Sequence, residues 1–442
     1  MKRRLVICLV LFAASFAVRI LVWQNNKIEM ATVQTVVTEN YLRDAHKLAS
    51  DDVRTFVAGD DPPTNARVID HPPGYPLAVG VVYAVAGDGD AWRFFQIALN
   101  SLAGLLLFLI AAALFSERVG IIAGSLAALS PQLAYHSGLL LPDELSVIPI
   151  LAAIYFLVRA MKDARLMNAV LCGLFLGVSC WLRSNALLLP VFFAIAATTI
   201  AAKGSRLEFT ATIVAVFLFI IAPITFRNAV CFDSFVPLSL GAGTTLVEGL
   251  GDIDDGSRGL PLTDEDVMAL DARLDASGTT YTALYDPNGV ERERRRIAFG
   301  RSVVAADPLW FAWGVVKRGS ATLRLERVPA IAPDRDEKET TNVVLYWINK
   351  PLKFLQRVFV TSVFLPLGVL GVIVLWLRKC YREMIVVAAV PLYYLTVQPL
   401  VHTEYRYVLA SLHFMFIFAA FAVCWACGKM LRRNVKGDTA AQ

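Results

Sequence analysis

The sequence predicts an all-α protein that crosses a membrane several times. Of its 442 residues, 57% are hydrophobic and only 18% are charged, whereas a soluble domain averages roughly 25% charged residues. The apolar residues gather in runs of about 17 to 25 residues, the length that spans the hydrocarbon core of a bilayer. Connectors rich in Lys and Arg alternate with connectors that are poor in them, as expected when successive loops lie on opposite sides of a membrane.

Each apolar run is a candidate transmembrane helix, and several of them are short. We expect about ten such helices. The runs cover residues 5–23, 94–115, 119–135, 145–158, 170–182, 186–202, 209–226, 358–377, 385–401 and 407–427.

The basic connectors predict the direction of the chain. Residues 1–4 (MKRR) precede the first run as in a signal peptide, but no small-residue cleavage site follows, so we expect a retained helix. Basic residues flank every second connector, which places both termini in the cytoplasm. The basic connectors are residues 116–118, 159–165, 203–206, 378–382 and the tail after residue 427.

Two long polar segments, residues 24–93 and 229–357, then lie outside. In the first, Tyr41, Ala45 and Leu48 share one helical face, which predicts a helix lying along the membrane surface. We therefore expect three parts: an N-terminal transmembrane core (1–229) with its first outer loop, a larger outer segment (230–357), and C-terminal helices with a cytoplasmic tail (358–442).

Charge and cysteine content exclude several classes of protein. A formal charge of +5 is too small and too localised at helix ends to indicate nucleic-acid binding. The seven cysteines fall mostly in apolar runs and form no disulfide framework. Cys424 and Cys427 make a CxxC pair, but without a second pair or a nearby His a metal site is not indicated.

Acidic residues at membrane depth are costly and therefore candidates for function. Asp143 and Glu144 lie at the outer mouth of a helix, within residues 139–145 (LLLPDEL). The alternative interpretation is a helix cap, since an Asp after a proline complements the helix dipole. Glu39 and His71 lie in the first outer loop, where Asp44, Asp51, Asp52 and Asp70 offer further carboxylates.

Arginines mark the outer ends of three apolar runs. Arg183, Arg227 and Arg406 could bind a lipid phosphate, since the guanidinium fork matches phosphate oxygens, or could only snorkel to headgroups. Residues 291–296 (ERERRR) are most simply a solvated helix face.

Several motifs together resemble the GT-C glycosyltransferases of the protein O-mannosyltransferase and lipid A aminoarabinose transferase type. The proline-rich start of the second membrane helix, the acidic outer loop and the arginine turn carry the likeness in the first half. Two further motifs carry it later in the chain. The motifs are residues 71–77 (HPPGYPL), 139–145 (LLLPDEL), 181–186 (WLRSNA), 223–228 (PITFRN) and 404–407 (EYRY).

The resemblance implies transfer of a sugar, with inversion, from a polyprenyl-phosphate donor to a lipid, glycan or protein acceptor at the outer face of the cytoplasmic membrane. It implies catalytic roles for Glu39 and Asp143, with Glu39 as the base. The family has an aspartate where Thr38 stands here, which leaves Glu39 as the acidic residue beside Tyr41. The expected donor- and phosphate-binding residues are His71, Glu144, Arg183, Arg227, Arg406 and Tyr407.

The resemblance leaves the metal requirement open, because a divalent metal serves some relatives. Two other classes also remain. A transporter or flippase of lipid-linked sugars would share the many helices and boundary arginines, but charges in the middle of spans, which it would need, are almost absent from the sequence. The second class is an inactive assembly partner, which is favoured by the presence of Thr38 where the family has an aspartate.

Overall fold

The computed structural model describes residues 2–50, 52–87, 89–161, 163, 165–200, 206–275, 278–325 and 343–438. Over these ranges the chain forms α- and 3-10 helices joined by short connectors, and they contain no strand. The all-α prediction is therefore confirmed.

Five helical stretches are long and apolar enough to cross a membrane, and a bent pair would make a sixth. The bent pair joins residues 350–358 to the following helix at 54°. The expected count of about ten is not reached by this criterion and stays a prediction. The helices involved are α1 (Lys2–Met30), α5 (Ala91–Asn100), α6 (Leu102–Leu114), α12 (Arg206–Phe232), α17 (Val343–Val358), α18 (Thr361–Leu377), α19 (Tyr381–Thr396) and α20 (Leu409–Asp438).

Shorter helices account for the difference in number. The run at 119–135 is broken, because Ser130 is extended and accepts a hydrogen bond from the Leu133 amide to start a new helix at Pro131. With 13 residues, α7 is about 20 Å long, less than the roughly 30 Å hydrocarbon core. The shorter helices are α4 (Gly74–Ala86), α7 (Glu117–Leu129), α8 (Pro131–Gly138), α9 (Val147–Ala160), α10 (Leu166–Leu182), η2 (Ser184–Ala186) and α11 (Leu189–Ile200).

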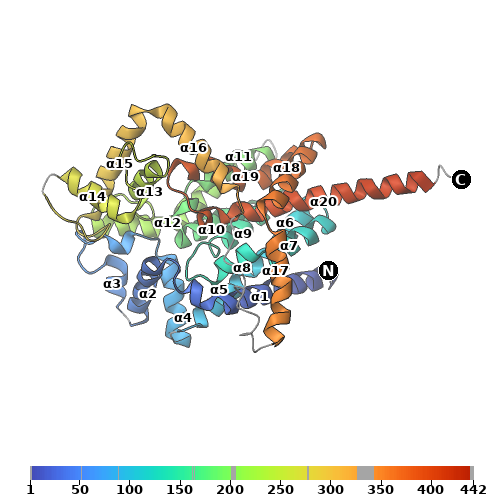
Figure 1. Ribbon diagram of the computed structural model, residues 1–442, viewed down its shortest axis with the longest axis horizontal. Helices are drawn as coiled ribbons and strands as arrows, with labels where there is room; N and C mark the ends of the chain where they lie inside the picture. The colour runs from blue at the N-terminus through green and yellow to red at the C-terminus, as the bar shows by residue number, and fades with distance from the viewer. Residues whose placement is uncertain are drawn as a thin grey trace.

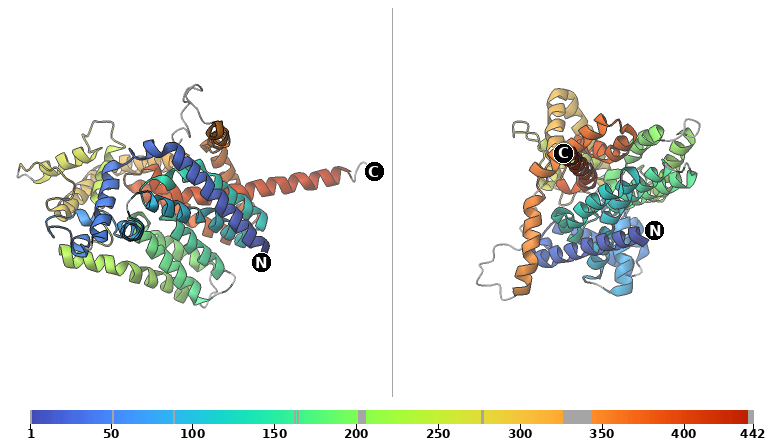
Figure 2. Two further views of the ribbon diagram at one scale, coloured as in Figure 1. Left: turned by 90° about the horizontal axis from the view of Figure 1, so that it is seen from below. Right: turned by 90° about the vertical axis from the view of Figure 1, so that its right-hand side faces the viewer.

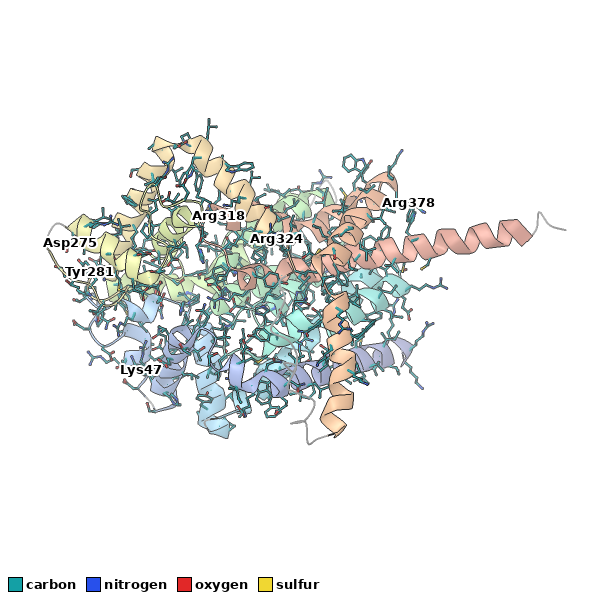
Figure 3. All side chains as sticks on the ribbon, in the orientation of Figure 1. Lys47, Asp275, Tyr281, Arg318, Arg324 and Arg378 are labelled. Atoms are coloured by element: carbon teal, nitrogen blue, oxygen red, sulfur yellow. The ribbon has the colours of Figure 1, made fainter. Side chains whose placement is uncertain are left out.

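The bundle has two distinct ends. Both chain ends lie at the same end of the molecule (Figures 1 and 2), and Arg378, in the connector between α18 and α19, lies there too (Figure 3). Arg4, Arg159 and Asp163 line one pocket at that end. Lys47, Asp275 and Tyr281 lie at the opposite end (Figure 3). The connector at Arg378 thus lies opposite the helices that carry Lys47 and Asp275, whereas α17 of the second polar segment lies away from those helices, beside α8.

The polar end is built from helices of both long segments. In the first, α2 packs on α4 through Tyr41 and Ala45, which are buried, as the spacing of these residues predicts. Close approach requires Gly80, since a Cβ there would lie 2.9 Å from the Ala45 carbonyl oxygen. The elements are α2 (Thr35–Ala49), α3 (Val53–Ala58), η1 (Arg67–Ile69), α13 (Ala242–Gly251), α14 (Asp264–Asp275), α15 (Gly289–Ala306) and α16 (Pro308–Thr322).

Backbone hydrogen bonds join the two polar segments. The Ala66 amide donates to the Tyr285 carbonyl at 3.0 Å, and the Leu240 amide donates to the Ile69 carbonyl at 2.8 Å. The Asn288 amide donates to the Thr64 carbonyl, also at 2.8 Å. The loop at residues 60–73, which leads into α4, is therefore held by the second outer segment.

Half of the charged block at 291–296 is buried, namely Arg292, Glu293 and Arg296, so its interpretation as a solvated face is wrong for these three residues. Arg292 and Arg296 are 1% and 0% exposed. Both guanidinium groups donate to Asp271 of α14, at distances from 2.5 to 3.0 Å. Glu293, on the same helix, accepts hydrogen bonds from the amides of Gly241 and Gly243, at the start of α13. The spacing of charges within a single helix could not show that a carboxylate from another helix lies between the two arginines.

Candidate functional site

The proline-rich motif places His71 and Tyr75 beside helix α2. The rings of Tyr41 and His71 are 4.8 Å apart, and those of Tyr41 and Tyr75 are 4.9 Å apart. Gly74 begins α4 directly against α10, and an added Cβ would lie 2.5 Å from the Trp181 carbonyl oxygen. The motif thus brings the first outer loop to the outer end of α10, where Arg183 follows.

Asp143 lies between two of the predicted arginines. Its side chain is 2% exposed. Arg183 Nη1 is 2.5 Å from Asp143 Oδ1, and Arg406 Nη1 is 3.9 Å from Asp143 Oδ2. The following helix α9 begins at Val147 with Ser146 as its N-cap, so Asp143 does not cap it. The carboxylate instead lies between two arginines that are 223 residues apart in the sequence (406 − 183).

Tyr407 and Glu404 complete this half of the site. The Arg183 guanidinium lies 4.4 Å from the Tyr407 ring centroid, close enough for a cation–π contact. Glu404 accepts two hydrogen bonds from Arg406, at 2.7 and 2.9 Å. Burial raises the pKa of the Glu404 carboxyl, but the hydrogen bond and charge of Arg406 outweigh burial and hold this pKa below its usual value. Glu404 therefore stays ionised and aligns Arg406.

The second outer segment also forms hydrogen bonds with the loop that carries Glu404. His402 Nδ1 lies 2.7 Å from Asp252 Oδ2, and the His402 amide donates to the Thr245 carbonyl. Burial lowers the pKa of His402, but Asp252 outweighs it and the net pKa is raised. Burial, together with the neighbouring Asp264, raises the pKa of Glu248 to about 8. The contact between α13 and this loop therefore contains two groups with raised pKa values, Glu248 and His402.

Arg227 lies in a second cluster, on the other side of Tyr41. A small pocket there is lined by Asp44, Asp70, His71 and Arg227, among others. Arg227 Nε and Nη2 donate to Asn228 Oδ1, at 2.9 and 2.7 Å. Among the described residues, no carboxylate lies within ion-pair distance of Arg227. Its guanidinium is therefore available to an anion in a way that those of Arg183 and Arg406 are not.

Asp44 and Asp70 bring carboxylates into the same pocket. Asp44 is one helical turn after Tyr41, and its side chain is 15% exposed. Burial raises the pKa of both carboxyls. Asp70 Oδ2 lies 3.5 Å from His71 Nε2. A carboxyl whose pKa is raised toward neutrality is a better proton acceptor for a hydroxyl than an ordinary surface carboxylate.

Tyr41 joins the two halves of the site. It is 5% exposed, and burial raises the pKa of its phenol. The charges of Arg183, Asp143, Asp70 and Arg406 all act on that phenol, and Tyr41 itself lines the small pocket with Asp44, Asp70 and Arg227. The enclosed pocket has about 10 Å³ free, room for about one water molecule. A sugar would require the pocket to widen.

Glu39 lies apart from this space. Its side chain is exposed, whereas Tyr41 and Ala45 of the same helix are buried. Within the described ranges it forms no hydrogen bond or ion pair. The sequence pattern correctly placed the buried face of α2, but the neighbouring carboxylate on that face is Asp44.

Glu144 also points away from the site. It is fully buried and lies near Arg19 of α1, at 3.5 Å, and His413 of α20, at 3.3 Å. Ionisable side chains thus are buried between these helices. His413 is four residues into α20, about 6 Å from its outer end, so the cluster lies near the outer surface and not at mid-span.

An apolar groove of 890 Å³ runs beside the site between α4, α10 and α12. Its two long walls end at Leu182 and Phe226, and the next residues in the chain are Arg183 and Arg227. Phe219 and Phe226 are 76% and 72% exposed, as expected for side chains that face lipid. The lining residues are Gly74, Leu77, Val178, Trp181, Leu182, Phe219, Ile220, Ala222, Pro223 and Phe226.

The described side chains include no cluster of several metal-ligating groups. No three or more His, Cys, Asp or Glu side chains among them are arranged to hold a metal ion. Both oxygens of Asp143 already face guanidinium groups. We therefore derive no step through a metal.

Comparison with known proteins finds a family model that matches part of the chain. Residues 70–226 match the family model described as dolichyl-phosphate-mannose-protein mannosyltransferase. This range holds His71, Asp143, Arg183 and the groove. A search of curated proteins finds no match to the sequence.

Solved structures share the fold over nearly the whole chain. The archaeal oligosaccharyltransferase AglB from Archaeoglobus fulgidus, in complex with an inhibitory peptide and a dolichol-phosphate, matches with a TM-score of 0.53 and 15% identity. The alignment covers 98% of this chain and 52% of AglB. The A. fulgidus oligosaccharyltransferase in complex with Zn and sulfate gives a TM-score of 0.52 at 14% identity, over 98% and 51% of the two chains. The chain thus spans about half the length of these relatives.

A third structure, ArnT from Cupriavidus metallidurans bound to undecaprenyl phosphate, has a TM-score of 0.38 and 14% identity, over 87% of this chain and 72% of ArnT. The chain therefore shares its fold with the archaeal oligosaccharyltransferases. Within this fold, residues 70–226 are similar to the protein mannosyltransferase family model. The resemblance predicted from the motifs is therefore confirmed.

Proposed function

We propose that the protein is a membrane glycosyltransferase that takes a sugar from a polyprenyl-phosphate donor and transfers it, with inversion, to an acceptor at the outer membrane face. The observation that carries this proposal is the apolar groove whose walls end at Leu182 and Phe226, directly before Arg183 and Arg227 in the chain. An isoprenoid chain suits a lipid-facing apolar groove, and its phosphate would then reach the arginines. The dolichol-phosphate in the AglB complex supports the same class of donor.

Arg227 is the proposed primary ligand of the donor phosphate. Its guanidinium has only Asn228 as a described hydrogen-bond partner, and it lines the pocket with His71. Arg183 and Arg406, held by Asp143, would contact the phosphate as negative charge develops on it, in an arrangement that needs little reorganisation. Tyr407 keeps the Arg183 plane in place.

Asp44 is the proposed base. The acceptor hydroxyl oxygen attacks the anomeric carbon of the sugar, the bond from that carbon to the phosphate oxygen breaks, and the hydroxyl proton passes to Asp44. The electron pair of the broken bond stays on the phosphate, where the arginines stabilise it. Asp70 would hold His71 toward the same space. Glu39, the base implied by the family pattern, is the competing assignment, and Asp143 has an orienting role.

The proposed location is the cytoplasmic membrane, with both termini inside and the site outside. It rests on the bias of inner loops toward Lys and Arg and on the position of both chain ends and Arg378 at one end of the bundle. About ten spans would then require the shorter helices to cross or enter the bilayer as part of the bundle.

The test is donor turnover by the purified protein. Radiolabelled undecaprenyl-phosphate hexoses and pentoses are supplied in turn with lipid, glycan and peptide acceptors, and release of undecaprenyl phosphate is measured. Asp44→Asn should lower turnover by roughly 100-fold or more while donor binding persists. Arg227→Lys keeps the charge but loses the fork, so donor binding should weaken by about 1.5–3 kcal/mol.

Glu39→Gln is the matched comparison on the same helix, and it should leave turnover near the parent value. A large loss in Glu39→Gln with an active Asp44→Asn would return the base to Glu39. Absence of turnover with every donor, together with transport of a lipid-linked sugar across reconstituted vesicles, would replace the enzyme with a flippase. Absence of both would favour the inactive partner.

A further inference from the structure

A buried triad lies directly beneath the proposed site. Arg19, Glu144 and His413 (the inner triad) are each 0% exposed and come from α1, the loop before α9, and α20. Glu144 Oε1 lies 3.5 Å from Arg19 Nη2 and 3.3 Å from His413 Nε2. None of the three has a role in the proposed chemistry. Ionisable groups buried among membrane helices are costly, so their presence calls for a function.

The hydrogen bonds around the triad fix the orientation of its groups. Arg19 donates from Nε to Ser137 Oγ at 2.9 Å and from Nη1 to Ser15 Oγ. His413 Nδ1 lies 3.0 Å from the Leu409 carbonyl oxygen. A carbonyl only accepts, so Nδ1 carries a proton and Nε2 is the atom that faces Glu144. Both neighbours of Glu144 are thus held in place by second contacts.

Asp143 and Glu144 are neighbours in the chain, and they contact the segment at residues 405–413 at two different points. Asp143 points outward to Arg406, in the 3-10 turn η4 (Tyr405–Val408), and Glu144 points inward to His413, two helical turns later. These two contacts, made by Arg406 and His413, are seven residues apart. Together they fix the position of this segment along its axis and its rotation relative to Asp143. With one attachment, Arg406 could rotate away.

We propose that the inner triad positions Asp143 between Arg183 and Arg406, and that His413 is a positioning residue for phosphate binding. The inference rests on the proposed function, because it assumes that these arginines bind the donor phosphate. The triad acts through the backbone of residues 143–144 and does not touch the donor.

Two amide substitutions separate positioning from packing. In His413→Gln, the side-chain amide can take the place of Nε2 and donate to Glu144. In His413→Asn, the shorter amide can replace only Nδ1, which contacts Leu409. Both variants bury a polar amide of similar kind, so a purely structural role predicts similar behaviour. Asn168→Ala, which removes part-buried hydrogen bonds to the carbonyl and the carboxylate of Asp163, is the control for loss of side-chain hydrogen bonds elsewhere.

The probe is undecaprenyl phosphate, titrated against each full-length variant in lipid nanodiscs. His413→Asn should raise the dissociation constant on the order of tenfold, while His413→Gln and Asn168→Ala stay within about twofold of the parent. Equal affinities in the Asn and Gln variants would overturn the proposal. If His413→Asn does not fold, Ser137→Ala releases Arg19 Nε more gently and should weaken binding by about two- to fivefold; unchanged binding there would overturn it too.

A parent protein that does not bind undecaprenyl phosphate would refute the proposed function and not the triad. The triad is then judged by hydrogen exchange at the Ser146 and Val147 amides, which bond to the carbonyls of Pro142 and Glu144. Faster exchange in His413→Asn than in His413→Gln supports the positioning role. Equal exchange in the two variants overturns it.

Discussion

Asp271→Asn is the substitution with the largest expected effect on the outer segment. The carboxylate is 2% exposed and receives hydrogen bonds from Arg292 and Arg296, which are 1% and 0% exposed. Replacing it by a neutral amide leaves two buried guanidinium groups without their shared counter-charge. Breaking a buried pair in this way costs about 3–5 kcal/mol. Since each 1.4 kcal/mol is a factor of ten, the α15 amides should exchange with solvent at least about 100-fold faster.

Hydrogen exchange followed by mass spectrometry measures this change segment by segment. Glu291→Gln is the control on the same helix, because Glu291 is 57% exposed and pairs only with the partly exposed Arg295. Such a pair contributes about 0.2–1 kcal/mol, so its loss should change exchange by less than about tenfold. If Asp271→Asn changes exchange no more than Glu291→Gln, the buried cluster does not stabilise the outer segment and the reasoning fails.

Three further outcomes are expected. Gly74→Ala puts a Cβ 2.5 Å from a backbone oxygen of α10, so it should lower the free energy of unfolding by about 1–3 kcal/mol, seen as a lower thermal midpoint in detergent. In the folded protein the pKa of Glu248 is raised to about 8, and the pKa of His402 is also raised. Both shifts favour the protonated form in the folded state, so the free energy of unfolding should fall as pH rises from about 5 to 8. The decrease should be up to about 1.4 kcal/mol per pH unit for each proton. Glu248→Gln should flatten that profile in a thermal-shift series, and an unchanged slope would exclude Glu248 as its source. A cysteine at Leu274 should react with an impermeant maleimide on intact cells and one at Arg378 should not; the reverse pattern would invert the topology.

The sequence predicted those parts of the site that depend on local pattern. The spacing of Tyr41 and Ala45 placed the buried face of α2, and the outer ends of apolar runs placed Arg183 and Arg406 near the acidic loop that carries Asp143. These predictions succeed because burial periodicity and membrane boundaries are properties of single segments.

Long-range partners could not be predicted in the same way. His413 was one histidine in an apolar run, and Asp271 was one of several acids on an outer helix, until the fold brought each to its buried partners. Glu39 was chosen over Asp44 because it stood beside Tyr41 in the family pattern, although residues three apart share a helical face and residues two apart do not. Asp51, another of the carboxylates named from the sequence, lies outside the described residues.

The joint between the loop at residues 60–73 and the second outer segment is made by main-chain groups. Ala66, Leu240 and Asn288 contribute amide hydrogens, and the acceptors are carbonyl oxygens. Such bonds make no demand on side-chain identity, so most replacements at these three positions should leave the joint intact. Proline is the exception, because it has no amide hydrogen to donate. Insertions or deletions between the paired residues would shift the register of all three bonds, so length, and not composition, is what this part of the chain must preserve.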